Sequence, residues 1–185
     1  KTKDSAVKSA FIKANTTENM LTIDMPLKER SKFHLDEILK IRIEIDTDPP
    51  KGAETEDHYL LTPIPFPVRV YSKEDLFAGK MHAILCRNWV SRVKGRDWFD
   101  MIWFIANEIS LHLSHLEERM RQSGHYSEKG CLTLDKLQEM INKRIEFLNI
   151  EQAKEDIVNF IKDPSQLEVW SRHFFKLIMK KIEVI

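Results

Sequence analysis

The chain has 185 residues, of which 29 are basic and 29 acidic, so its formal net charge at pH 7 is zero. A chain without net charge does not gather nucleic acid through a whole-molecule field, and any phosphate binding requires a local cluster of basic residues. The hydrophobic fraction of 42% excludes a disordered chain. The length predicts one domain or two small subdomains.

The two cysteines, Cys86 and Cys131, lie far apart and show no metal-type spacing. Reduced thiols in a cytoplasmic protein are the simplest interpretation. No apolar run approaches the roughly 20 residues of a membrane helix, and no signal-peptide pattern opens the chain. The first residue is Lys1 and the opening segment is typical of the end of a helix, so we expect a fragment of a longer protein.

The first half of the chain predicts one helix followed by short strands. Apolar residues are spaced as in a helix over residues 5–15. Apolar and polar residues then alternate over 41–46, which indicates a strand that ends before two prolines. Two further short strands are expected at 58–62 and 66–71, where prolines suit edges or turns.

From Ser72 onward the pattern is helical. Ser72 and Asp75 resemble a capping box, and two more helices are expected at about 97–107 and 109–121. Further N-caps are indicated at Thr133, Asn149 and Asp163. The last helix is expected to have a buried face made of Val169, Trp170, Phe174, Leu177 and Ile178.

These elements predict an α+β fold, with a small sheet early in the chain and a bundle of five or six helices after it. We expect a sheet subdomain over residues 1–72 and a helical subdomain over 73–185.

A cluster of basic residues lies on the helix expected after Ser72 and in the turn that follows this helix. Lys80 and Arg87 are seven residues apart and share a helix face. Arg92, Lys94 and Arg96 crowd into the next turn, around a glycine. Lysine offers a point charge and arginine a two-pronged fork for phosphate oxygens, and the next helix N-terminus adds backbone donors. The cluster predicts a phosphate-binding pocket.

Two carboxylates accompany the basic cluster. Asp97 and Asp100 lie one turn apart, and Asp97 follows Arg96, where a carboxylate can orient a cation or accept a proton. The alternative is structural: Asp97 caps its helix and favours the positive end of the dipole, and the basic residues form a solvated face.

A second acidic pattern lies on the strand at 41–46. Glu44 and Asp46 are two residues apart, so both point to one side, about 7 Å apart along the strand, with Asp48 beyond. Paired carboxylates suit Mg²⁺, which shares its coordination shell with substrate phosphates. On the pattern alone, a solvent-facing edge of an antiparallel sheet is the favoured interpretation.

For the histidines and tryptophans, a structural role is the favoured interpretation. His112 and His115 have a spacing that a metal accepts, but no Cys or carboxylate lies at a recognised interval from them. His82 and His173 are expected to pack beside apolar neighbours. The tryptophans are expected in the core, although they could stack on bases, and they are Trp89, Trp98, Trp103 and Trp170.

The stretch Leu-Phe-Ala-Gly-Lys-Met-His-Ala-Ile-Leu-Cys-Arg, followed by Arg-Val-Lys-Gly-Arg-Asp-Trp-Phe-Asp, resembles the Lys helix and Arg-Asp-x-x-Asp motif of the AbiEii/AbiGii toxin family. The segments Ile-Glu-Ile-Asp-Thr-Asp-Pro-Pro and Ser-Ala-Phe-Ile-Lys-Ala-Asn resemble that family's acidic strand and an earlier family segment. The resemblance covers roughly residues 5–125, and the helices after residue 130 are generic.

The resemblance implies a nucleotidyltransferase with a polymerase-β-like sheet and a helical C-terminal part. Many members are toxins of bacterial toxin–antitoxin pairs, including systems that abort phage infection, and some transfer nucleotides to the acceptor end of tRNA. It therefore implies Mg²⁺, a nucleoside triphosphate, an RNA acceptor such as tRNA, and a cognate antitoxin.

The resemblance also implies roles for individual residues. Glu44, with Asp46, matches the acidic metal-binding strand. Lys80 matches the lysine that holds the triphosphate, and Asp97 the aspartate with a catalytic or substrate-orienting role. Arg96 matches a flank of the Arg-Asp-x-x-Asp motif, and Asp100, its second aspartate, has a supporting role.

The chain departs from the family in one respect. The family's Gly-rich turn and following pair of aspartates, its main metal ligands, have no match here, and Asp46-Thr47-Asp48 lacks the Gly-Ser turn. We therefore expect this chain alone to be inactive and its full-length parent to be active. Two alternatives keep the scaffold without the chemistry: a non-catalytic helical partner, and an RNA-binding module with salt-dependent affinity that uses the cations at positions 87–96.

Overall fold

The computed structural model describes residues 7–15, 38–88 and 93–185. Contacts within the chain divide it into two units, residues 1–49 and 50–185. Strands precede helices along the chain, so the α+β class is confirmed. The boundary that we expect between residues 72 and 73 stays a prediction. No helix in the described ranges is long and apolar enough to cross a membrane.

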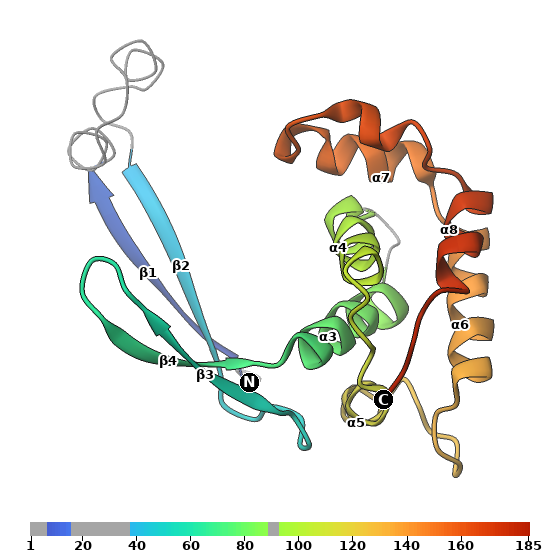
Figure 1. The fold of residues 1–185 in the computed structure, drawn as a ribbon, viewed down its shortest axis with the longest axis horizontal. Coiled ribbons are helices and arrows are strands. Elements are labelled where there is room, and N and C mark those ends of the chain that lie inside the picture. Colours follow the sequence, from blue (N-terminus) through green and yellow to red (C-terminus); the bar gives the residue numbers. More distant parts are fainter. Residues whose placement is uncertain (1–6, 16–37, 89–92) are drawn as a thin grey trace, which may run out of the picture. The chain divides into compact units, whose positions relative to one another are not determined.

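The first unit is a two-stranded antiparallel ribbon. Strand β1 (Val7–Asn15) pairs along its length with β2 (Ile38–Asp46) (Figure 1). The helix expected over residues 5–15 is therefore wrong. The register sets Ala10 opposite Ile43 and Ile12 opposite Ile41, so apolar positions of both strands coincide. Pairing with a β-branched partner strand outweighs the helix propensity of the alanines and lysines in this segment.

The second unit begins with a β-hairpin. Strand β3 (Thr55–Leu60) pairs antiparallel with β4 (Phe66–Tyr71), with Asp57 opposite Arg69. The strand expected at 66–71 is confirmed, and the one expected at 58–62 begins three residues earlier. The side chains of Asp57 and Arg69 form an ion pair across the hairpin, with Arg69 Nε 2.8 Å from Asp57 Oδ1.

Helix α3 (Lys73–Cys86) follows the hairpin directly. The Ser72 hydroxyl caps it by accepting the Asp75 amide at 3.2 Å, as the capping pattern predicts. The carboxylate of Asp75 does not return to Ser72. It accepts from the Glu54 amide and lies 2.6 Å from His112 Nδ1. This buried carboxylate joins the hairpin to two helices, and it gives His112 a hydrogen-bonding partner.

Among the described residues after α3, five α-helices and two 3₁₀ segments follow. Thr133 and Asn149 are N-caps, as predicted. The elements are α4 (Gly95–Ala106), α5 (Leu113–Gln122), α6 (Leu134–Glu146), α7 (Ile150–Ile157), η1 (Val158–Phe160), η2 (Pro164–Leu167) and α8 (Arg172–Met179).

The last predicted helix is wrong in its start, and of the residues expected on its buried face Trp170 is buried, whereas Phe174 is only partly so. Asp163 caps only the 3₁₀ segment η2, and α8 begins after the cap residue Ser171. This break shifts the register of the buried stripe, which contains Phe175 and Met179, whereas Val169 and Leu177 are exposed. Helix α8 packs along α6 (Figure 1).

The core of the second unit gathers aromatic rings from α4, α8 and the preceding turn. Phe175 lies 5.0 Å from the Trp98 ring and 5.2 Å from the Trp170 ring, centroid to centroid, and both tryptophans are buried. The core expectation is thus confirmed for these two. It is wrong for Trp103, which is 46% exposed, and Trp89 lies outside the described residues. The expectation for His173 is also wrong, because this residue is exposed.

Gly95 allows α4 to begin in direct contact with α7. A Cβ added at this position would lie 1.8 Å from the carbonyl oxygen of Ala153, which is fully buried. Backbone cannot yield as the tip of a flexible side chain does, so any larger residue forces the two helices apart. The glycine of the basic turn is therefore required by helix packing.

We predict that Gly95→Ala lowers the free energy of unfolding by about 1–3 kcal/mol, because the added methyl group overpacks the α4–α7 contact. Gly79→Ala is the matched control. Its Cβ would meet nothing closer than Arg119 Cζ at 3.7 Å, and alanine is favoured over glycine inside α3 by about 0.5–1 kcal/mol. Urea unfolding curves of both variants test this, and equal stabilities would contradict the packing argument.

Candidate nucleotide-binding site

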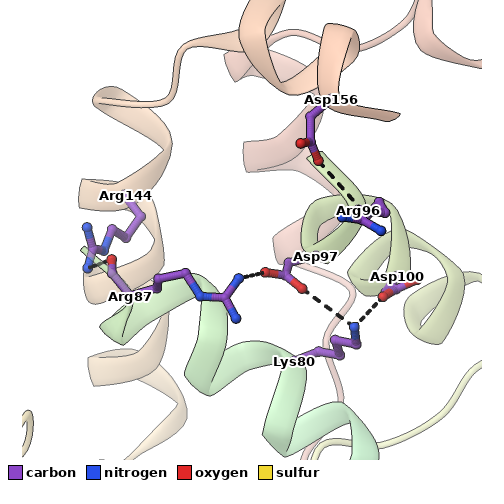
Figure 2. A network of polar contacts seen from close by, with 7 residues as sticks. All are labelled: Lys80, Arg87, Arg96, Asp97, Asp100, Arg144 and Asp156. Atoms are coloured by element: carbon purple, nitrogen blue, oxygen red, sulfur yellow. Dashed lines mark hydrogen bonds and ion pairs between the residues drawn. The ribbon is translucent and has the colours of Figure 1, made fainter. Parts of the chain in front are cut away.

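The predicted basic cluster is organised around the carboxylate of Asp97 (Figure 2). Arg87 Nη1 donates to Asp97 Oδ2 at 2.6 Å, and Lys80 Nζ lies 3.5 Å from Asp97 Oδ1. Lys80 Nζ also lies 2.6 Å from Asp100 Oδ2. The side chain of Asp97 is 9% exposed, whereas those of Lys80 and Arg87 are each 39% exposed. The two cations of α3 thus share a face, as their spacing predicts, and reach one nearly buried anion.

Asp97 does not cap its helix. The N-cap of α4 is Lys94, and no side chain makes a cap hydrogen bond there. Asp97 occupies the first turn, where a negative charge interacts favourably with the helix dipole. Its oxygens contact the two cations of α3, so Asp97 is not the cap of α4, and the role of orienting these cations stays a prediction.

Arg96 is held by different partners. Its Nε lies 3.8 Å from Asp156 Oδ2, and its guanidinium carbon lies 4.6 Å from the centre of the Phe160 ring. Consecutive helix residues point in different directions, so Arg96 and Asp97 contact different neighbours despite their adjacency in sequence. Asp156 and Phe160 belong to α7 and η1, where no motif marked them in advance.

These side chains line a pocket of about 500 Å³, within the usual size range of small-molecule sites. Four cations and two carboxylates face it, so the pocket is locally positive in a chain of zero net charge. Arg92, the remaining predicted phosphate ligand, lies outside the described residues. The lining residues are Lys80, Arg87, Lys94, Arg96, Asp97, Phe99, Asp100, Ile157, Phe160 and Ile161.

Arg144 on α6 supports the end of α3 that carries Arg87. Its Nε donates to the carbonyl oxygen of Leu85 at 2.8 Å, and its Nη2 donates to that of Arg87 at 3.3 Å. The last carbonyls of a helix need such external donors. Arg144 therefore fixes the backbone from which the Arg87 side chain extends, and no local sequence signal could reveal it, because its partners lie 57 and 59 residues away.

The predicted metal ligands lie in the first unit. Glu44 and Asp46 alternate along β2 opposite Ser9 and Val7, so both belong to one side of the ribbon. Asp46 Oδ1 also accepts from the Asp48 amide at 3.0 Å. Two carboxylate side chains on one strand face fit part of a Mg²⁺ coordination set, whose other positions are taken by waters and phosphates. Their metal-binding role stays a prediction.

A cation-lined pocket and an acidic strand within an α+β fold are features that the resemblance to nucleotidyltransferases implies. The family model described as "Nucleotidyl transferase AbiEii toxin, Type IV TA system" matches residues 9–179. The chain therefore belongs to the AbiEii family of nucleotidyltransferase toxins. The match extends through the helices after residue 130, beyond the range of the motif resemblance. Neither the search of curated proteins nor that of solved structures gave a match.

We predict that Asp97→Ala destabilises the protein by about 1–3 kcal/mol, because it leaves Lys80 and Arg87 facing each other without their shared anion. Asp100→Ala is the matched control. It breaks a pair in which both side chains are more than one-third exposed, so less than about 1 kcal/mol is expected. Chemical denaturation compares the two, and an equal loss would show that Asp97 does not organise the cluster.

Proposed function

We propose that this chain carries the triphosphate-binding part of a metal-dependent nucleotidyltransferase that transfers a nucleotide from a nucleoside triphosphate to RNA such as tRNA. The observation that carries the proposal is the pocket lined by Lys80, Arg87, Lys94 and Arg96. It concentrates positive charge at one place in an otherwise neutral chain, which is the arrangement that polyanion binding requires.

The ion pairs of the pocket suit a binding role. Lys80 and Asp100 are each more than one-third exposed, so their pairing contributes little stability, and a phosphate group can replace Asp100 as the partner of Lys80. Asp97 is far more buried and keeps both α3 cations in place during such an exchange. Lys80 would thus neutralise the triphosphate, and Asp97 would orient Lys80 and Arg87.

The proposed reaction is an in-line displacement at the α-phosphate. The 3′-hydroxyl oxygen of the RNA forms a bond to the α-phosphorus, the bond from that phosphorus to the bridging oxygen breaks, and pyrophosphate leaves. The hydroxyl proton passes to solvent. Glu44 and Asp46 would hold Mg²⁺, which would supply positive charge to neutralise the developing negative charge. Positioning and electrostatic stabilisation by the side chains of the pocket carry the remaining effect.

The Gly-rich turn and aspartate pair of the family are not in this sequence, so the proposal concerns the binding half, and its tests use the complete gene product. The family is that of a type IV toxin–antitoxin system, and a cognate antitoxin is the implied partner. We propose a cytoplasmic location, which agrees with the free thiols of Cys86 and Cys131.

We predict that the complete gene product moves label from an α-labelled nucleoside triphosphate into cellular RNA. Lys80→Ala and Asp97→Asn should each lower this transfer by about 100-fold or more, because preorganised charges at the phosphates are lost. Lys143→Ala is the matched control, since Lys143 is 70% exposed and pairs with Glu139 on its own helix.

Transfer that survives both pocket variants would refute the site. If no nucleotide is transferred by the folded wild-type protein, the alternatives are separated by RNA binding. Strongly salt-dependent binding that persists in Asp97→Asn identifies an RNA-binding module, and no binding favours a non-catalytic partner.

We predict that Glu44→Gln lowers transfer and raises the Mg²⁺ concentration required for half-maximal activity, because an amide oxygen is a weaker ligand for this ion than a carboxylate. Glu56→Gln on β3, where the carboxylate contacts His58, is the control and should leave the Mg²⁺ requirement unchanged. A magnesium titration of activity distinguishes the two. An unchanged requirement in Glu44→Gln would remove Glu44 from the metal site.

A further inference from the structure

Three ligand-type side chains converge at the C-terminal half of α3, outside the pocket lining. His82 and Cys86 are four residues apart on α3 and share a face, and His125 follows α5. One ligand atom from each residue lies within 4.8 Å of the others. In the parts of the chain that the structure describes, no other group of three His, Cys, Asp or Glu residues meets this condition. Cys86 and Cys131 do not have a metal-type spacing. His82 and Cys86, four residues apart on one helix, do have a spacing at which two side chains can bind one metal ion.

The three side chains meet at the hydroxyl of Ser123. His82 Nε2 lies 2.8 Å and His125 Nδ1 2.9 Å from Ser123 Oγ, and the Cys86 thiol also interacts with this hydroxyl. Ser123 Oγ itself donates to the carbonyl oxygen of Met120 at 3.2 Å. Because the single hydroxyl proton goes to Met120, only the two lone pairs of Ser123 Oγ remain, and they accept from at most two of the three side chains. The cluster thus holds one more polar side chain than its central group can serve.

We propose that His82, Cys86 and His125 bind one transition-metal ion of the zinc class, with Ser123 or a water molecule as the fourth ligand. One thiolate and two imidazoles form a mixed sulfur and nitrogen set that selects zinc over magnesium or calcium. Ligand atoms around tetrahedral zinc are about 3.3–3.8 Å apart, so the side chains must close by roughly one ångström. His125 is exposed on a loop, where such a movement meets little packing.

The protonation of the cluster is compatible with metal binding. Burial, followed by the charge of Arg119, lowers the pKa of His82 to about 4, so its ring is neutral and keeps a lone pair at pH 7. Burial raises the pKa of the Cys86 thiol to about 11, and a bound metal replaces the thiol proton. The charges of Arg119 and Arg87 oppose positive charge at His82 and therefore oppose a dication, whereas the charge of Arg144 favours the Cys86 thiolate.

A metal at this place would join α3 to the loop after α5. Cys86 immediately precedes Arg87, and α3 also carries Lys80, so the ion would stabilise the helix that presents two cations of the pocket. The inference does not depend on the proposed transfer reaction, and metal binding is measured without any nucleotide.

The test begins with the complete protein, freed of any affinity tag and stripped of metal with a chelator. Zn²⁺ is titrated against a coloured competing chelator, and Co²⁺ is added to a parallel sample. We expect one ion per chain, with the visible absorption of tetrahedral cobalt and a thiolate-to-cobalt charge-transfer band. At a Zn²⁺ concentration of about 100 times the Kd, the unfolding midpoint should rise by about 5–10 °C.

Variants identify the ligands. Cys86→Ala should abolish the charge-transfer band, and both Cys86→Ala and His125→Ala should weaken Zn²⁺ binding by roughly 100-fold. Cys131→Ser and His173→Ala are matched controls, because both residues are exposed and outside the cluster, and they should bind as the wild type does.

His125→Ala keeps the test decisive if Cys86→Ala fails to fold, since His125 is exposed. The absence of stoichiometric binding in the wild type would overturn the proposal. Undiminished binding in folded His125→Ala, or a charge-transfer band lost in Cys131→Ser instead of Cys86→Ala, would overturn it as well.

Discussion

The pairing of Asp97 with Lys80 and Arg87 determines where two of the four cations of the pocket lie. The two cations come from one helix and would repel each other across a partly dry space if no anion lay between them. Asp97 can play this part because the first turn of α4 is fixed against α7, where Gly95 admits the backbone of Ala153. The electrostatics of the pocket therefore follow from the packing of helices, and the long basic side chains are oriented by a short buried one.

Local signals predicted much of the fold. The caps at Ser72, Thr133 and Asn149 were correct because a cap depends on a side chain and an amide only two or three residues away. The predictions for the segments that form β1 and α8 were wrong, because these segments depend on distant or non-α-helical structure. The conformation of β1 is set by pairing with a strand more than 20 residues later, and the start of α8 is set by a 3₁₀ segment that the cap pattern at Asp163 does not distinguish from an α-helix.

The candidate site was predictable to the same extent. Lys80 and Arg87 could be placed together by their spacing, and Asp97 by its position after a basic turn. Asp156, Phe160 and Arg144 could not, because each meets its partner across a tertiary contact with helices that carry no motif. Of the cluster around Ser123, the sequence could place only His82 and Cys86 together, by their helical spacing. His125 reaches them through the packing of α5 against α3.

The close approach of Gly95 to Ala153 has a consequence for how such sequences can diverge. The helix that carries the Arg-Asp-x-x-Asp motif and the helix that covers it touch backbone to backbone, with no side chain between them to absorb a change. A substitution at position 95 is therefore tolerated only with a compensating displacement of α7, which also carries Asp156, the partner of Arg96. The motif and the seemingly generic helix form one structural unit, and grafting the motif alone onto another helical scaffold would transfer its charges without their geometry.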